Sequence, residues 1–112
     1  MGTTIYHNPK CSKSRQTLQL LEDNGVTPEI VLYLDTPPTV DEMKGLLKKL
    51  GKSAADILRS KEAKEAGLSA DMDEDALIKG MIANPRCIER PIVVKGGNAV
   101  LGRPPENVLK LI

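Results

Sequence analysis

The sequence predicts an α/β fold with a small mixed β-sheet flanked by helices. Two β-prone runs, residues 3–6 and 30–34, enclose a segment with helical spacing that begins at Ser12. Strands joined through a helix are normally parallel neighbours, so these elements predict a βαβ unit. Further along, residues 92–94 and 99–101 flank two adjacent glycines, a pattern typical of an antiparallel hairpin.

The elements of the βαβ unit have local start and stop signals. Residues 3–6 are rich in β-formers, and a turn at Pro9 ends that strand. The helix that starts at Ser12 is expected to end near Asn24. Residues 30–34 are apolar without interruption, which predicts a buried central strand.

The middle of the chain predicts an all-helical insertion, about residues 39–84, between the βαβ unit and the C-terminal β-hairpin plus helix. Thr39 opens its first helix with a capping box. Ser53 opens a short second segment that carries Arg59, and Asp73 caps a further helix. After the hairpin, the last helix of the chain is expected to begin at residues 104–106, where two prolines precede a glutamate.

Length and composition fit one globular domain, residues 1–112. The formal net charge is +1, whereas nucleic-acid binders carry a large basic excess. Tyr6 and Tyr33 are the only aromatic residues, so a platform for base stacking is also excluded. We expect no nucleic-acid partner.

The near-neutral total conceals an uneven distribution of charge. Residues 1–21 carry three basic and no acidic side chains, and residues 85–112 carry five basic and two acidic ones. The intervening residues 22–84 carry 8 basic and 13 acidic side chains. The positive charge therefore lies at the two ends of the chain, and if the fold is right the two ends meet around one small anion site.

The two cysteines, Cys11 and Cys87, could pair or stay free. A secreted disulfide scaffold would hold more cysteines, and the chain opens without the apolar core of a signal peptide. The longest strongly apolar run, residues 30–34, is far shorter than the ~20 residues of a membrane helix. We expect a cytoplasmic protein with reduced thiols and no membrane partner.

Cys11 lies between the first predicted strand and the start of a helix. There, free backbone N–H groups and the helix dipole stabilise a thiolate and attract anions. His7, Lys10, Lys13 and Arg15 lie within four residues on either side. We interpret His7 as a helper of the thiolate, through a hydrogen bond or positive charge, and the other three as supporting electrostatics. A cysteine at this turn favours the thioredoxin-like version of the fold.

A second thiol is not provided next to Cys11. Ser14 occupies the place that a Cys-x-x-Cys redox pair would need. Cys87 follows an apolar helix and is interpreted as a packed core residue. An oxidised or adducted Cys11 therefore needs an external thiol, for which we expect glutathione as co-substrate, with no bound cofactor. His7 and the two cysteines are too few and too irregularly spaced to predict a metal site.

Three arginines are candidates for holding an anion beside Cys11. Arg90 precedes an apolar strand, Arg103 follows the hairpin, and Arg59 ends a short helix. Guanidinium groups suit oxyanions because they stay charged and donate in pairs. Each arginine alone would be interpreted as a solvated surface side chain. Together with Cys11, the three arginines predict an arginine-lined pocket for a small oxyanion.

Several segments together resemble the glutaredoxin-coupled arsenate reductases, the ArsC type within the ArsC/Spx superfamily, and its shorter-chain relatives. The likeness is specific at residues 6–15 (Tyr-His-Asn-Pro-Lys-Cys-Ser-Lys-Ser-Arg) and at residues 89–94 (Glu-Arg-Pro-Ile-Val-Val). It continues at residues 32–38, 58–59 and 102–106, in order along nearly the whole chain. Ser12-Lys13 replaces the Gly-Thr pair of the best-known reductases, as in the shorter relatives.

This resemblance implies a thioredoxin-like fold with a helical insertion, and reduction of arsenate to arsenite. Cys11 would attack arsenate, with His7 assisting the thiolate. Arg59, Arg90 and Arg103 would bind the oxyanion. Glutathione would then attack the adduct and glutaredoxin would resolve the mixed disulfide. The resemblance also implies a cis peptide bond between Arg90 and Pro91.

Two other functions fit the same resemblance. One is a regulatory protein of the Spx type that binds RNA polymerase, although Ser14 removes the Cys-x-x-Cys switch that many of those proteins use. The other is a thiol oxidoreductase that acts on glutathione mixed disulfides, for which arsenate is incidental.

Overall fold

The computed structural model describes residues 2–112, and its sheet has four strands in the order β2-β1-β3-β4. The chain divides into two compact units. The first, here called the sheet unit, contains the residues up to Thr36 together with Arg90–Ile112. The second, the helical unit, is Pro37–Glu89. The prediction of a single domain, residues 1–112, stays a prediction.

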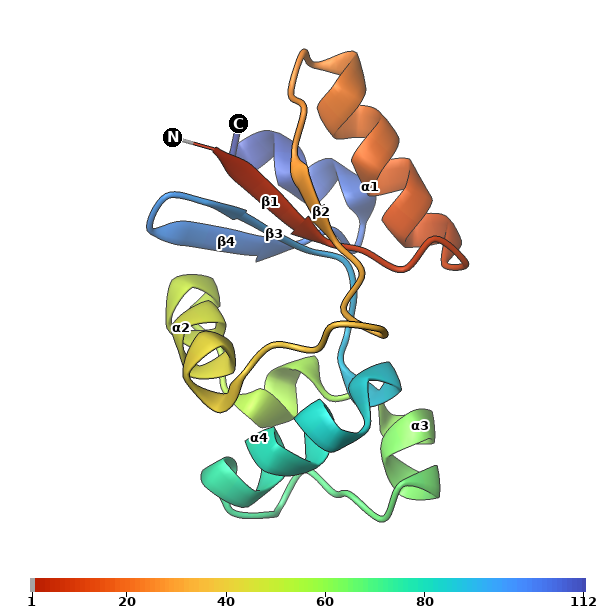
Figure 1. The fold of residues 1–112 in the computed structure, drawn as a ribbon, viewed down its shortest axis with the longest axis vertical. Coiled ribbons are helices and arrows are strands. Elements are labelled where there is room, and N and C mark those ends of the chain that lie inside the picture. The colour runs from red at the N-terminus through yellow and green to blue at the C-terminus, as the bar shows by residue number, and fades with distance from the viewer. Residues whose placement is uncertain (1) are drawn as a thin grey trace. The chain divides into compact units, whose positions relative to one another are not determined.

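The sheet is mixed, as predicted. β1 (Thr3–Tyr6) pairs in parallel with β2 (Glu29–Val31) and antiparallel with β3 (Ile92–Lys95). β3 continues through a hairpin into β4 (Asn98–Leu101). Gly96 in the hairpin turn has φ +61°, a conformation that glycine adopts without steric cost. Figure 1 shows β1 between β2 and β3.

Two helices pack against one face of this sheet. They are α1 (Ser12–Asp23) and the C-terminal η3 (Pro105–Lys110). Their contact with the sheet is a core of four fully buried side chains, Ile5, Leu21, Val93 and Val108. The last helix is 3₁₀ and not α-helical: Asn107 N–H donates to the carbonyl of Pro104, three residues back.

The prediction of a buried central strand at residues 30–34 is wrong. β2 covers only Glu29–Val31 and lies at the edge of the sheet, since it pairs with β1 alone. Ile30 is 47% exposed, and Leu32 and Leu34 are each 40% exposed. The chain turns after Val31, because the amides of Asp35 and Thr36 donate to the carbonyl of Leu32. A continuous apolar run does not by itself separate a buried strand from an edge strand followed by a turn.

The helical unit begins as its capping signals predict. α2 (Val40–Leu50) starts at a complete capping box, in which Glu42 N–H donates to Thr39 Oγ1 at 3.1 Å and Thr39 N–H donates to Glu42 Oε1 at 2.9 Å. Gly51 ends the helix with φ +69°.

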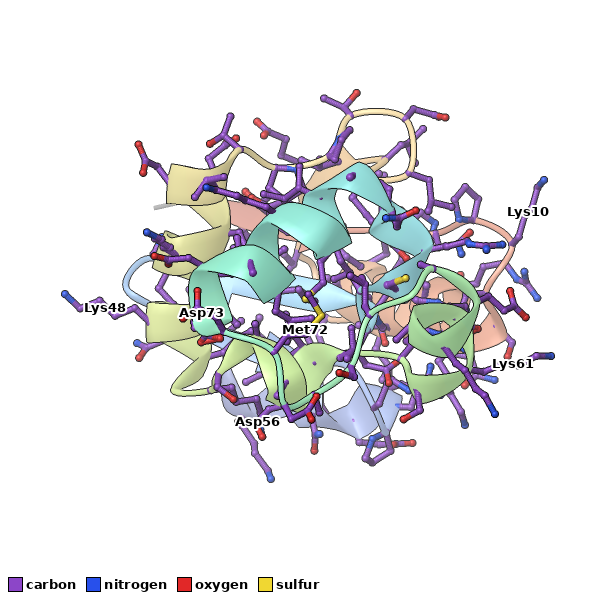
Figure 2. The ribbon with its side chains drawn as sticks, turned by 90° about the horizontal axis from the view of Figure 1, so that it is seen from below. Lys10, Lys48, Asp56, Lys61, Met72 and Asp73 are labelled. Carbon is purple, nitrogen blue, oxygen red and sulfur yellow. The ribbon has the colours of Figure 1, made fainter. Side chains whose placement is uncertain are left out.

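The remaining helices of this unit are short. They are η1 (Ala54–Ile57), α3 (Ser60–Glu65), α4 (Glu74–Ala83) and η2 (Pro85–Cys87). Asp73 caps α4 as predicted, since its carboxylate accepts from Ala76 N–H at 3.3 Å, and Figure 2 shows Asp73 at the start of that helix. Arg59 is not carried by the segment that Ser53 opens, because η1 ends at Ile57. It lies between η1 and α3, as the N-cap of α3.

The close approach of three segments at Gly102 gives a prediction about stability. A Cβ at Gly102 would lie 2.5 Å from Thr17 Oγ1 and 2.8 Å from Pro91 Cγ. Gly102→Ala should therefore lower the free energy of unfolding by about 1–3 kcal/mol, as measured by urea titration, because α1 must shift away from the end of the hairpin.

Gly97→Ala is the matched control in the same hairpin, since nothing lies within 4 Å of the added Cβ and φ is not positive. It should change the free energy of unfolding by no more than about 0.5 kcal/mol. Equal stabilities for the two variants would contradict the close packing at Gly102.

Candidate active site

Cys11 is the last residue before α1, as the sequence predicts. Its backbone is extended (φ −95°, ψ 124°), its N–H donates to Asn8 O at 3.0 Å, and its carbonyl accepts from Arg15 N–H at 3.0 Å. The N–H groups of the first helical turn, at Ser12, Lys13 and Ser14, have no carbonyl partner within the helix. They give the region of the Cys11 thiol a positive electrostatic potential.

This setting favours the thiolate. Partial burial by itself would raise the pKa of the Cys11 thiol. The backbone N–H groups of Ser14 and Lys13 and the guanidinium of Arg90 outweigh that effect, so the pKa lies below its ordinary value. Cys11 is only half-buried, which leaves the residue open to a reactant. Cys11 thus combines a stabilised negative charge with access.

Ser14, which the sequence indicated only as the absent second cysteine, holds the loop before Cys11 in place. It is fully buried, and its Oγ lies 2.6 Å from Nδ1 of His7. The same Oγ accepts from Asn8 N–H at 3.0 Å. Its own hydroxyl hydrogen is then available to a neutral His7 ring. A small polar residue one helical turn into α1 is the only sequence signal of this role.

His7 contributes to the site without a charge. Burial and the nearby positive charge of Arg15 lower the pKa of His7, so the ring is neutral at pH 7. Of the two means by which we expected His7 to help, a lowered pKa favours the hydrogen bond over positive charge, and the role of His7 stays a prediction. The His7 ring hydrogen-bonds to Ser14 Oγ, which places Ser14 between His7 and the start of α1.

The structure brings Arg90 and Arg103 together at the end of the hairpin. Gly102 N–H donates to Pro91 O at 2.9 Å, and Arg103 Nη1 donates to Arg90 O at 3.4 Å. The Nε atom of Arg90 is buried and has no hydrogen-bond partner among the residues that the structure describes. The expected cis bond between Arg90 and Pro91 is confirmed, and the Arg103–Pro104 bond is cis as well.

Arg59 lies in the helical unit and is already engaged by two carboxylates. Its Nη1 is 2.9 Å from Glu89 Oε1, and its Nε is 3.3 Å from Glu62 Oε1. Burial acts to lower the pKa of Arg59, but these carboxylates outweigh it and raise that pKa. The sequence alone did not indicate that either glutamate pairs with Arg59. The role of Arg59 in oxyanion binding stays a prediction.

The other three basic residues near Cys11 are exposed. Arg15 Nη1 donates to Pro9 O at 2.9 Å and so closes the loop before α1. Lys10 is tied down only through its backbone N–H, which donates to Asn8 Oδ1 at 3.0 Å. Its side chain extends into solvent (Figure 2). Lys13 contributes its backbone N–H to the Cys11 site.

Cys87 is a packed core residue, as interpreted from the sequence. It is fully buried in the helical unit and is not in a disulfide. Burial raises the pKa of its thiol, and the carboxylates of Glu62 and Glu65 act in the same direction. A buried thiol with a raised pKa is a poor partner for exchange with Cys11.

Among residues 2–112, no group of three or more His, Cys, Asp and Glu side chains is arranged to hold a metal ion. Within the same residues, no helix has the length and apolar character needed to cross a membrane.

Comparison with known proteins agrees with this geometry. The sequence model of the ArsC family matches residues 6–111. An arsenate reductase of Neisseria meningitidis serogroup A is 48% identical over 93% of this chain and 92% of its own length. The uncharacterized protein YfgD of Escherichia coli K12 is 54% identical over 96% of this chain and 94% of its own. The chain belongs to the ArsC family.

A solved structure confirms the fold class. The structure of an arsenate reductase from Vibrio cholerae superimposes with a TM-score of 0.94 and 48% sequence identity. It covers 100% of this chain and 98% of its own. The predicted α/β, thioredoxin-like fold, with a small mixed sheet flanked by helices, is therefore confirmed.

The burial of His7 gives a prediction about its titration. His7 is the only histidine in the chain, so its ring C–H signals in a proton NMR spectrum are unambiguous. They should titrate with a midpoint below about 6.5, the value of an unperturbed histidine, and return to about 6.5 in denaturing urea.

The same shift fixes the sign of a pH effect. As the pH falls below about 6.5, the unfolded chain takes up a proton that the folded ring resists, so the free energy of unfolding should decrease. A folded-state midpoint at or above 6.5 would contradict the lowered pKa of His7.

Proposed function

We propose that this chain is an oxidoreductase that reduces arsenate to arsenite at Cys11. The observation that carries the proposal is the placement of the Arg90 guanidinium beside a thiol at the N-terminus of α1. This arrangement offers a nucleophile and an oxyanion-binding group at one point. Relatives at 48% identity that bear the name arsenate reductase support arsenate as the oxyanion.

Arsenate would bind through charge-assisted hydrogen bonds. The backbone N–H groups of Lys13 and Ser14, the buried Nε of Arg90 and the adjacent Arg103 supply donors within the sheet unit. The family resemblance assigns Arg59 to the oxyanion as well; within the helical unit its guanidinium is held by Glu62 and Glu89.

The first step is substitution at arsenic. The Cys11 thiolate donates an electron pair to As(V), a sulfur–arsenic bond forms, and an arsenic–oxygen bond breaks with loss of the oxygen as water after protonation. Arsenic remains As(V) in this step. Arg90 and the helix N-terminus stabilise the negative charge on the remaining oxygens.

The second step is the reduction. A glutathione thiolate attacks the sulfur of Cys11, a sulfur–sulfur bond forms, and the sulfur–arsenic bond breaks with its electron pair left on arsenic. Arsenic becomes As(III) and leaves as arsenite, while the two thiols are oxidised to a mixed disulfide. Glutaredoxin or a second glutathione then exchanges with that disulfide and restores the Cys11 thiol.

This use of external thiols follows from the surroundings of Cys11. Ser14 stands where a neighbouring second thiol would be, and Cys87 is buried with a raised pKa. A reaction that consumes glutathione belongs in a reducing compartment, so we place the protein in the cytoplasm.

The proposal predicts which cysteine the activity needs. With arsenate, glutathione and glutaredoxin, the wild-type chain should form arsenite, and Cys11→Ser should reduce the rate to background. Cys87→Ala is the matched control and should keep the activity where the chain remains folded. Arg90→Gln should lower kcat/KM for arsenate by about tenfold to a hundredfold, the range for a lost hydrogen bond to a charged group.

Arsenite formation that survives Cys11→Ser would contradict the mechanism. If wild-type protein reduces glutathione mixed disulfides and gives no response to arsenate, the chain is a thiol oxidoreductase instead. Stable capture by purified RNA polymerase without either activity would favour the Spx-type reading.

A further inference from the structure

A pocket of about 240 Å³ lies beside the loop that precedes Cys11. One wall is the chain from His7 to Lys10, and the other is formed by Leu32, Leu34 and Asp35. All of these residues belong to the sheet unit. The pocket exists because the chain turns away from the sheet directly after β2, next to the loop that leaves β1.

The pocket is separate from the oxyanion site. Neither Cys11, Arg90 nor Arg103 lines it. It is nevertheless close to the nucleophile, because Lys10 directly precedes Cys11 and consecutive Cα atoms are about 3.8 Å apart. A ligand held in this pocket therefore lies against the residue that directly precedes the nucleophile.

The residues that line the pocket combine apolar surface with one charge of each sign, and the Lys10 side chain extends from the lining into solvent (Figure 2). Leu32 and Leu34 are each 40% exposed, more than is usual for leucine beside a well-formed sheet. Lys10 and Asp35 form no ion pair with any described residue. The matching ligand has a carboxylate, an ammonium group and an uncharged stretch between them. These are the features of a small peptide.

We propose that this pocket binds the thiol co-substrate as a small peptide zwitterion, with a carboxylate at Lys10, an ammonium group at Asp35 and its sulfur at Cys11. The proposal rests on the proposed function in that Cys11 reacts with an external thiol. It adds the residues that select a peptide thiol over an uncharged one.

Binding is tested without any reaction by S-methylglutathione, whose sulfur cannot exchange. Titrated into ¹⁵N-labelled protein, it should shift the amide signals of Asn8, Lys10, Leu34 and Asp35 saturably. Asp35→Asn should weaken this binding about two- to fivefold, the range of a solvent-exposed ion pair. Asp23→Asn, an exposed control on α1, should leave it unchanged.

Selectivity is tested by disulfide exchange. The Cys11 thiolate attacks one sulfur of oxidised glutathione, a new mixed disulfide forms, and one glutathione thiolate leaves. Asp35→Asn should slow this reaction about two- to fivefold and leave the rate with uncharged hydroxyethyl disulfide unchanged. Lys10→Gln should slow the reaction with oxidised glutathione more than that with hydroxyethyl disulfide.

The proposal would be overturned if Asp35→Asn slowed the reactions with oxidised glutathione and hydroxyethyl disulfide equally. It would also be overturned if S-methylglutathione did not shift the amide signals of the pocket residues. No arsenate enters either experiment, so the two proposals fail separately. If the chain reduces arsenate but does not distinguish the two disulfides, only the proposal for the pocket is rejected. If the chain distinguishes the two disulfides but does not reduce arsenate, only the proposed arsenate reaction is rejected.

Discussion

The N-terminus of α1 is the feature on which the rest of the site depends. Three backbone N–H groups there have no carbonyl partner in the helix, and Cys11 is the residue that precedes them. Negative charge on the cysteine sulfur or on a bound oxyanion satisfies these donors. Ser14 stabilises the loop before Cys11, because it is fully buried and its Oγ is hydrogen-bonded to the His7 ring and to the backbone N–H of Asn8.

The antiparallel pairing of β1 with β3 brings the arginines to this helix end. Tyr6 at the end of β1 is opposite Ile92 at the start of β3, so the chain leaves β1 toward Cys11 where Arg90 and Pro91 enter β3. The hairpin then returns Arg103 to the same place. The basic first and last parts of the sequence therefore converge on one point, which explains how a chain of net charge +1 concentrates positive charge beside Cys11.

Much of the fold and of the candidate site could be predicted from the sequence, because helix caps and turns are specified by residues close together in the chain. The helix caps at Thr39 and Asp73 and the hairpin turn at Gly96 each involve residues only a few positions apart. All three lie where the sequence predicts them. Cys11 and Arg90 could be identified from their positions at element ends. The edge position of β2 could not, because the apolar run that includes Ile30 looks the same in an edge strand and in a central one.

The missed parts of the site depend on tertiary contacts. Ser14 becomes important only when α1 packs against the end of β1 and buries it beside His7. The same burial lowers the pKa of His7, which its position in the sequence does not indicate. Glu89 engages Arg59 from 30 residues away, a separation over which no sequence pattern specifies a contact. The oxyanion role of Arg59 still rests on family resemblance.

The central claim is that Cys11 is held as a thiolate by the α1 N-terminus and Arg90. The most direct measurement is the pH dependence of iodoacetamide alkylation at the Cys11 peptide, followed by mass spectrometry in wild type, Arg90→Gln and the exposed control Arg86→Gln. We predict a pKa for Cys11 below the ordinary value of about 8.5, raised by Arg90→Gln and unchanged by Arg86→Gln. A wild-type pKa near 8.5 that Arg90→Gln does not move would contradict the claim.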